Sequence, residues 1–213
     1  CFLGEVFPIL PGRDLTLYDA AVVSRSWEQK RLRQLYDLAL GKTPLQIISW
    51  EAMSQRTMPR STLMDAAFSL EVGTEYEINR LIAQLTGSGY SRCGMVEGPG
   101  QFAVRGGILD VYSPAADRPF RAEFFGDELD TMGYFDPDTQ RRTENTDEVV
   151  LLPVGETRPS LHPDGITGLC GDISRFIERQ KRRKTPNEAL ISTLQKDLEK
   201  FGNGIQNAAS DRY

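Results

Sequence analysis

Apolar side chains recur with helical spacing near the start of the chain. A capping-box sequence at 26–29 precedes apolar residues spaced i, i+3, i+4 and i+7, and Gly41 follows as a helix stop. We expect a helix there, a short buried strand at 45–49 and a brief helix over 50–58 that ends before a proline. Two prolines and a glycine predict a turn at 8–12.

The middle of the chain alternates between apolar and polar residues, as strands do. Residues 68–72 alternate first, and a second capping box at 74–77 then predicts a helix whose apolar stripe consists of Ile78, Leu81, Ile82 and Leu85. Five strand-like runs are predicted, at 101–104, 108–112, 120–125, 129–135 and 149–152. Because their links are too short for crossover helices, sequential strands should pair antiparallel, and one helix on such a sheet makes an α+β domain.

The last part of the chain is again helical in pattern. One helix is predicted at 173–183. Residues 185–188 indicate the start of another, with proline at the first helical position. The apolar face of this second helix would consist of Leu190, Ile191, Leu194 and Leu198. Together the patterns predict an α/β protein that divides at 1–66, 67–152 and 153–213.

Composition narrows the function classes. The 213 residues include 25 basic and 30 acidic side chains, and the net charge of −5 disfavours a dominant nucleic-acid-binding surface. No apolar run approaches the ~20 residues that span a bilayer, and no signal peptide opens the chain, so we expect a cytoplasmic protein without membrane contact. Because the chain begins with Cys1 instead of Met, we interpret it as a piece of a longer protein.

Residues for metal or nucleophile chemistry are sparse. The three cysteines are far apart without a C-x-x-C motif, which argues against a disulfide framework or a zinc site. The only histidine, His162, is expected to be structural. Carboxylates cluster at Glu123, Asp127, Glu128, Asp130, Asp136 and Asp138. Since no histidine or nucleophile accompanies them, we expect no catalytic residue, no cofactor and no metal.

Two short motifs have ordinary explanations. Gly41-Lys42-Thr43 copies the end of a phosphate loop, but the glycine required five positions earlier is Tyr36, and the order of strand and helix is reversed. We interpret it as a helix-to-strand turn. The basic stretch 181–184, with Arg175 and Arg179 upstream, could contact phosphate or form a solvated helix end. The acidic chain favours the helix end.

The sharpest feature is the run QFAVRGGILD followed by FRAEFFGDE. A Gly-Gly turn joins two strands, and Arg105 leaves at the end of the first. Arg121 and Glu123 share one face of their strand, and Phe125 shares it if the strand continues. Arginine and aromatic side chains are typical of protein–protein hot spots. An ordinary polar sheet face, with Arg121 paired to Glu123, has the same composition.

The two longer runs, QFAVRGGILDVYSP and PFRAEFFGDELDTMGYFDPDTQR, resemble the second domain of the UvrB/Mfd family of bacterial repair proteins. The resemblance covers about residues 5–160 and includes the flanking segments 89–92 and 149–153. It is closer to the Mfd branch, because the tyrosine-rich hairpin of UvrB is not found, and because the segments 7–11 and 30–35 are similar to the first domain of Mfd.

This resemblance implies a degenerate P-loop-like α/β lobe at 1–66 that has lost its phosphate loop. A module like UvrB domain 2, at 67–152, would be inserted into it, and 153–213 would return to the lobe. The family function implied is non-catalytic: the module docks on UvrA and recruits nucleotide excision repair to a stalled RNA polymerase. The parent would be an ATP-dependent DNA translocase that contacts polymerase and DNA through other regions.

The family's UvrA-contacting arginines correspond to Arg105 and Arg121, and Phe125 is the aromatic residue of that patch. Glu123 and Arg92 match the contact set of UvrB. The alternative function is a UvrB-like nucleotide- or DNA-binding lobe of the excision nuclease system, which would require affinity for ATP or hydrolysis stimulated by DNA.

Overall fold

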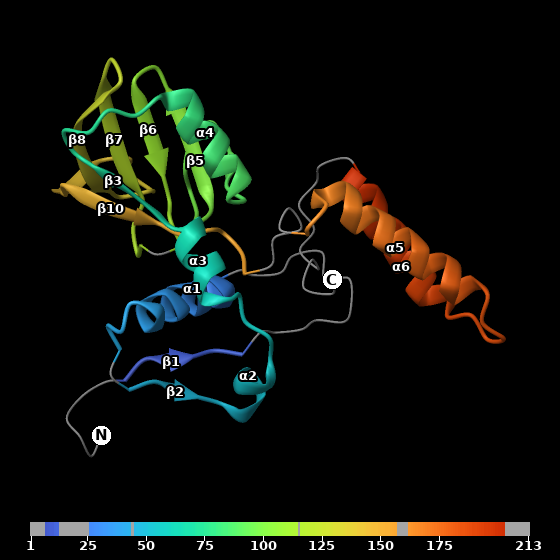
Figure 1. The fold of residues 1–213 in the computed structure, drawn as a ribbon. Helices are drawn as coiled ribbons and strands as arrows, with labels where there is room; N and C mark the ends of the chain where they lie inside the picture. The colour runs from blue at the N-terminus through green and yellow to red at the C-terminus, as the bar shows by residue number, and fades with distance from the viewer. Residues whose placement is uncertain (1–6, 13–25, 44, 115, 157–161, 203–213) are drawn as a thin grey trace. The chain divides into compact units, whose positions relative to one another are not determined.

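The computed structural model describes residues 7–12, 26–43, 45–114, 116–156 and 162–202 (Figure 1). The chain divides into two compact units, one of residues 1–14 and 24–156 and one of residues 15–23 and 157–213. The described residues form helices and mostly antiparallel sheets, so the predicted mixed α/β class is confirmed. None of the described helices is long and apolar enough to cross a membrane.

The first unit begins with short helices and a two-stranded sheet. Its elements here are β1 (Ile9–Leu10), α1 (Ser26–Ala39), β2 (Ile47–Ile48), α2 (Trp50–Ser54) and α3 (Arg60–Ala66). Leu32 of α1 packs with Met58 and Leu63 in a small buried cluster. β1 and β2 pair in parallel. Gly41 follows α1 with φ of +69°, which confirms both the helix stop and the turn that leads to β2.

Two expectations for this segment are wrong. The turn predicted at 8–12 contains β1, which can form because both prolines lie outside the two-residue strand. The strand predicted at 45–49 is shorter and is not buried. Ile47 and Ile48 remain 48% and 38% exposed, because a sheet of two strands leaves their side chains uncovered.

The larger part of the first unit is built on a six-stranded sheet with the order β4-β5-β6-β7-β8-β9. Its strands are β4 (Ser91–Arg92), β5 (Gln101–Arg105), β6 (Ile108–Val111), β7 (Phe120–Phe125), β8 (Glu128–Phe135) and β9 (Arg142–Asn145). Neighbours run antiparallel, except that β4 is parallel to β5. The antiparallel order of sequential strands is therefore confirmed from β5 to β8, whereas β4 and β9 were too short and polar to be predicted.

The last predicted strand, β10 (Glu148–Leu151), does not join this sheet. It pairs antiparallel with β3 (Phe68–Glu71), so that Leu151 lies opposite Phe68. The predicted order of pairing is wrong here. Alternation along each segment shows that a strand forms, but it does not show which distant strand it pairs with.

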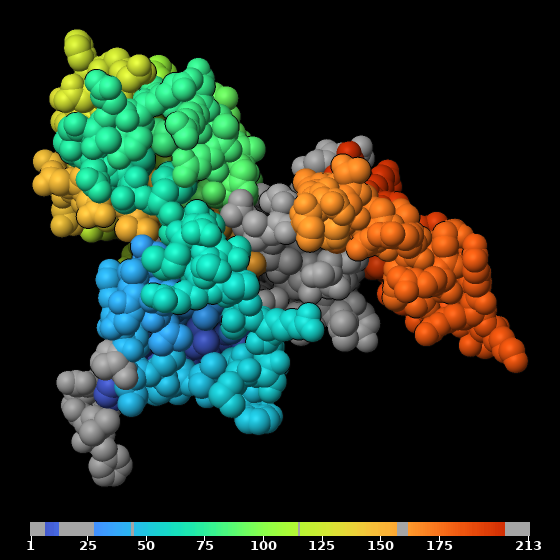
Figure 2. Space-filling view, viewed as in Figure 1, coloured from blue at the N-terminus to red at the C-terminus, as the bar shows by residue number. Residues whose placement is uncertain are grey.

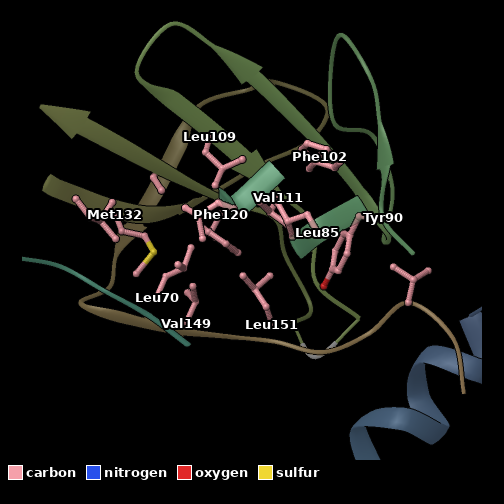
Figure 3. Packing of buried hydrophobic residues seen from close by; sticks show 14 residues of the cluster. Leu70, Leu85, Tyr90, Phe102, Leu109, Val111, Phe120, Met132, Val149 and Leu151 are labelled. Atoms are coloured by element: carbon pink, nitrogen blue, oxygen red, sulfur yellow. The ribbon is translucent and has the colours of Figure 1, made fainter. Parts of the chain in front are cut away.

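The core lies between one face of the six-stranded sheet and a second layer made of β3, β10 and α4 (Ile78–Gly87) (Figure 3). The sheet contributes Phe102, Leu109, Val111, Phe120 and Met132, and the second layer contributes Leu70, Leu85, Val149 and Leu151. Tyr90 points its hydroxyl at the Leu152 carbonyl oxygen, 2.6 Å away, so this buried phenol is satisfied. Burial raises the pKa of Tyr90.

The capping box predicted at 74–77 is wrong, although the helix it was meant to open is confirmed. α4 begins at Ile78, and its N-cap residue makes no side-chain capping bond. The residues before it pair with the sheet instead: Leu129 N–H donates to the Thr74 carbonyl, and Tyr76 N–H donates to the Asp127 carbonyl. Tertiary hydrogen bonds thus replace the local cap.

The second unit, in its described residues 162–202, is a pair of helices. α5 (Gly165–Lys181) and α6 (Glu188–Gly202) enclose a buried cluster of Leu169, Ile173, Ile177, Ile191, Leu194 and Phe201. α5 begins earlier than the predicted 173. α6 is capped by Asn187, whose Oδ1 accepts from Leu190 N–H, and not by the predicted Thr185. Leu190, predicted to face the core, is 36% exposed.

A buried ion pair joins α1 to the end of the first unit. Arg31 and Glu156 have side chains 0% and 1% exposed, and Arg31 Nε lies 2.7 Å from Glu156 Oε2. The other carboxylate oxygen accepts from Met58 N–H, and Arg31 Nη1 donates to the Pro11 carbonyl. Four separate segments of the unit therefore depend on one pair of charges.

Replacing Glu156 with alanine should lower the free energy of unfolding by about 3–5 kcal/mol, because it leaves the Arg31 charge buried without its partner. Urea denaturation of the chain measures this loss. The control is Asp117→Ala, which removes an exposed ion pair to Arg33 and should cost less than about 1 kcal/mol. Equal losses for the two variants would contradict the assigned role of the buried pair.

Candidate functional site

The candidate site is the outer face of the six-stranded sheet, defined by Arg105, Asp110, Arg121, Glu123 and Phe125. It is the face opposite the core layer. The backbone register places Asp110 of β6 directly across from Arg121 of β7. Directly opposed residues share one face of a sheet, so the two side chains meet there.

Asp110 is the centre of this face. Its side chain is 1% exposed, and its carboxylate accepts from two arginines. Arg121 binds it with two parallel hydrogen bonds, Nε to Oδ1 at 2.6 Å and Nη2 to Oδ2 at 2.9 Å. Arg105 Nη2 lies 2.5 Å from the same Oδ2. One buried carboxylate on β6 therefore orients two guanidinium groups, one from β5 and one from β7, the strands on either side of it.

Arg121 is the more firmly held of the two arginines. The hydrogen bonds that Arg121 donates to the Asp110 carboxylate raise the pKa of Arg121 above its usual value, against the opposing effect of burial. Its guanidinium carbon lies 4.8 Å from the centre of the Phe135 ring, a cation–π distance. Only 19% of its side chain is exposed, compared with 48% for Arg105. Arg105 thus offers the larger accessible cationic surface.

Two glycines shape the turn after Arg105. Gly106 has φ of +61°, which favours glycine. At Gly107 a Cβ atom would lie 2.8 Å from the Phe124 carbonyl oxygen, and the Gly107 carbonyl accepts from Phe124 N–H at 2.7 Å. The Gly-Gly turn predicted from the sequence therefore packs directly on β7, at Phe124, the residue before Phe125.

Phe125 ends β7 at the tip of the next hairpin. β7 continues to this residue, which is the condition under which Phe125 was predicted to share a face with Arg121 and Glu123. Phe125 pairs with Glu128 across a two-residue turn that contains Gly126 at φ of +67°. The Phe125 ring is 83% exposed. Because Phe124 packs against the core, alternation along the strand turns Phe125 to the outer face.

The remaining predicted residues lie further from this centre. Glu123 pairs with Arg142, whose Nη1 is 3.4 Å from Glu123 Oε1. The alternative of an acidic partner for Arg121 within the sheet is therefore right in kind, but the partner is Asp110 and not Glu123. Arg92 is exposed on β4, and its register partner is the core residue Phe102. The register therefore places Arg92 on the core side of the sheet edge, and the structure does not bring it together with Arg105 and Arg121.

Asp110 was missed by the sequence reasoning. Its signal is a single carboxylate inside the otherwise apolar strand ILDV, between two strands that each carry an arginine. Buried charges require partners of opposite sign, so this pattern indicates an internal counter-ion. Recognising it would have required the strand register, which the sequence alone did not provide.

The other acidic side chains and the single histidine have structural roles or do not gather into one site. Asp136 accepts hydrogen bonds from Thr139 N–H and Oγ1 and from Asp138 N–H, which lower its pKa and fix the turn. His162 lies in the second unit, where its Nε2 is 3.4 Å from Asp172 Oδ2. Within the described ranges, no three histidine, cysteine or carboxylate side chains are grouped so that they could hold a metal ion.

Comparison with known proteins agrees with this architecture. Residues 68–156 match the family model of the UvrB interaction domain. The chain is 34% identical over 157 residues, 70% of its length, to a transcription-repair-coupling factor of Myxococcus xanthus. It is 27% identical over 92% of its length to that of Bacillus subtilis, and 32% identical over 65% of its length to that of Escherichia coli.

The chain spans 13%, 17% and 12% of the lengths of these three relatives. The matches confirm the resemblance found in the sequence, and they do not favour the alternative of a UvrB-like nucleotide- or DNA-binding lobe of the excision nuclease system. The chain is therefore a relative of one part of the transcription-repair-coupling factors, and it carries a UvrB interaction domain at residues 68–156.

Proposed function

We propose that the domain at residues 68–156 docks on UvrA through the outer face of its six-stranded sheet. The observation that carries this proposal is the arrangement around Asp110. A buried carboxylate holds Arg105 and Arg121 in place, and Phe125 stands 83% exposed on the same face. The function is recruitment of nucleotide excision repair, and this piece of the protein performs it without catalysis.

The chemistry of this face suits a protein partner that offers carboxylates beside an apolar pocket. Arginine pairs with carboxylates through two parallel hydrogen bonds, and an exposed ring gives an anchor that loses water on contact. Because Asp110 already fixes the guanidinium groups, less side-chain entropy is lost on binding. This preorganisation favours a specific complex over a diffuse charge attraction.

In the parent protein, the module belongs to a larger machine. We propose a cytoplasmic, ATP-dependent DNA translocase that acts on a stalled RNA polymerase and contacts polymerase and DNA through regions outside this chain. The helices and strands before residue 67 would be a degenerate P-loop-like lobe. The turn at Gly41, which lies after a helix and before a strand, supports a lobe without a phosphate loop.

Phe125→Ala gives the cleanest test of the docking face. The ring is mostly exposed, so the variant should unfold at the same temperature as the original chain, yet bind purified UvrA at least about 30-fold more weakly, or about 2 kcal/mol. Arg105→Ala should weaken binding by a similar amount. Surface-immobilised UvrA titrated with the chain measures both affinities.

The matched control is Arg80→Ala. Arg80 is an exposed cation on α4, in the layer that covers the opposite face of the sheet, and its loss should leave UvrA affinity unchanged. Full affinity in a folded Phe125→Ala, Arg105→Ala double variant would refute the docking proposal. Equal weakening by Arg80→Ala would replace it with a non-specific charge effect.

Asp110→Asn tests whether Asp110 positions the two arginines. We expect a loss of about 1–3 kcal/mol in the free energy of unfolding and roughly tenfold weaker UvrA binding, because the charged acceptor of both guanidinium groups is lost. Binding is measured at a temperature where circular dichroism shows the variant folded.

The control for Asp110→Asn is Glu144→Gln, which weakens an exposed ion pair to Arg118. It should change the free energy of unfolding and the free energy of UvrA binding by less than about 1 kcal/mol each. Unchanged UvrA affinity in folded Asp110→Asn would mean that Asp110 serves the fold alone.

A further inference from the structure

The hairpin of α5 and α6 carries a dense positive charge at its loop. Between residues 175 and 184 there are six basic side chains and one acidic side chain, although the whole chain has a net charge of −5. Lys181 to Lys184 are all exposed. The loop forms the narrow end of this unit in the space-filling view (Figure 2).

Part of this charge is accounted for by α5 itself. Arg175 pairs with Asp172, and Lys181 lies 2.9 Å from Glu178. Arg179 lies over the Phe176 ring at 5.9 Å. Arg179 and Lys181 are also in the last turn of the helix, where cations suit the negative end of its dipole. A solvated helix end therefore explains the basic residues up to Lys181.

It does not explain the three that follow. Arg182 is the C-cap of α5, and Arg183 and Lys184 lie beyond the helix, in the loop before Asn187 caps α6. Within the described part of the chain, no carboxylate lies within salt-bridge distance of these three side chains, although the Arg182 charge helps to lower the pKa of Glu178. We call them the basic tip. Three adjacent cations of which only Arg182 acts on a nearby carboxylate repel one another, so a polyanion would relieve an existing electrostatic cost.

The surroundings of the basic tip decide which polyanion fits. From Lys181 to Glu188 the sequence is KRRKTPNE, which has no apolar side chain apart from Pro186. A protein interface normally has an apolar or aromatic centre, and this loop offers none. A phosphate backbone needs only cations and polar donors, and it is bound without reference to sequence.

We propose that the basic tip, Arg182, Arg183 and Lys184, binds the phosphate backbone of duplex DNA without sequence preference. This is a second contact surface of the chain, independent of UvrA docking by the other unit and additional to the DNA contacts proposed above for other regions of the parent protein. Each phosphate neutralised releases counterions, so three contacts should make log K fall with log salt at a slope of about −2.7.

The test is titration of a fluorescent 25-base-pair duplex with the whole chain, from 20 to 200 mM salt. The test variant carries three substitutions, Arg182→Ala, Arg183→Ala and Lys184→Ala. It should bind the duplex at least about tenfold more weakly at the lowest salt, and the slope of log K against log salt should become about 2–3 less negative. Its fold should be intact, since all three side chains are exposed. Its affinity for UvrA should be unchanged.

The matched control removes three exposed cations elsewhere, Lys30→Ala, Lys42→Ala and Arg80→Ala, so that the net charge is the same. This variant should keep the DNA affinity and slope of the original chain. Equal weakening in both variants, unaltered binding in the tip variant, or no DNA binding by the original chain at 20 mM salt would overturn the proposal. Tip-dependent binding to polyglutamate as strong as to DNA would assign the tip to an acidic protein instead.

Discussion

The outer face of the sheet depends on one buried carboxylate. Asp110 is almost completely excluded from water in the middle of a strand, and an ionised group in that position needs compensating charge. Arg121 and Arg105 provide it. The arginines are therefore first a requirement of the fold, and a partner would meet them already oriented. Because the buried carboxylate requires the two arginines, the outer face can carry charge and still hold its side chains in fixed positions.

The core on the other side of the sheet keeps that surface in place. Phe120 and Ala122 alternate with Arg121 along β7, so burying the first two turns the guanidinium to the outer face. A slip of one residue in the register would exchange the two faces completely. The tight turn at Gly126 fixes the register of β7 with β8, and the hydrogen bond from Phe124 N–H to the Gly107 carbonyl ties β7 to the turn before β6. The position of each proposed binding residue thus rests on hydrophobic packing and turn geometry.

The sequence predicted those features that are encoded locally. β7 was predicted with its observed bounds, because alternation and a following glycine turn define it. The pairing of β10 with β3 was not predicted, since it joins residues distant in the chain, and the 74–77 segment was misassigned because it pairs with the sheet. Arg105, Arg121 and Phe125 were singled out by their strand positions and residue types, and the family resemblance implied their role. Asp110 was missed because its importance depends on the register between strands.

Two cationic surfaces of this chain differ in the way their charges are balanced. On the outer face, the arginines are compensated by the buried Asp110 carboxylate and accompanied by the exposed Phe125, so salt screens these arginine–aspartate pairs less than it screens fully exposed charges. At the basic tip, exposed cations lie in a loop whose only apolar side chain is Pro186, and salt screens such exposed charges more strongly. The first arrangement favours a folded protein with complementary carboxylates, and the second favours the phosphate backbone of a duplex. Charge count alone would not separate them; the presence of an internal counter-ion does.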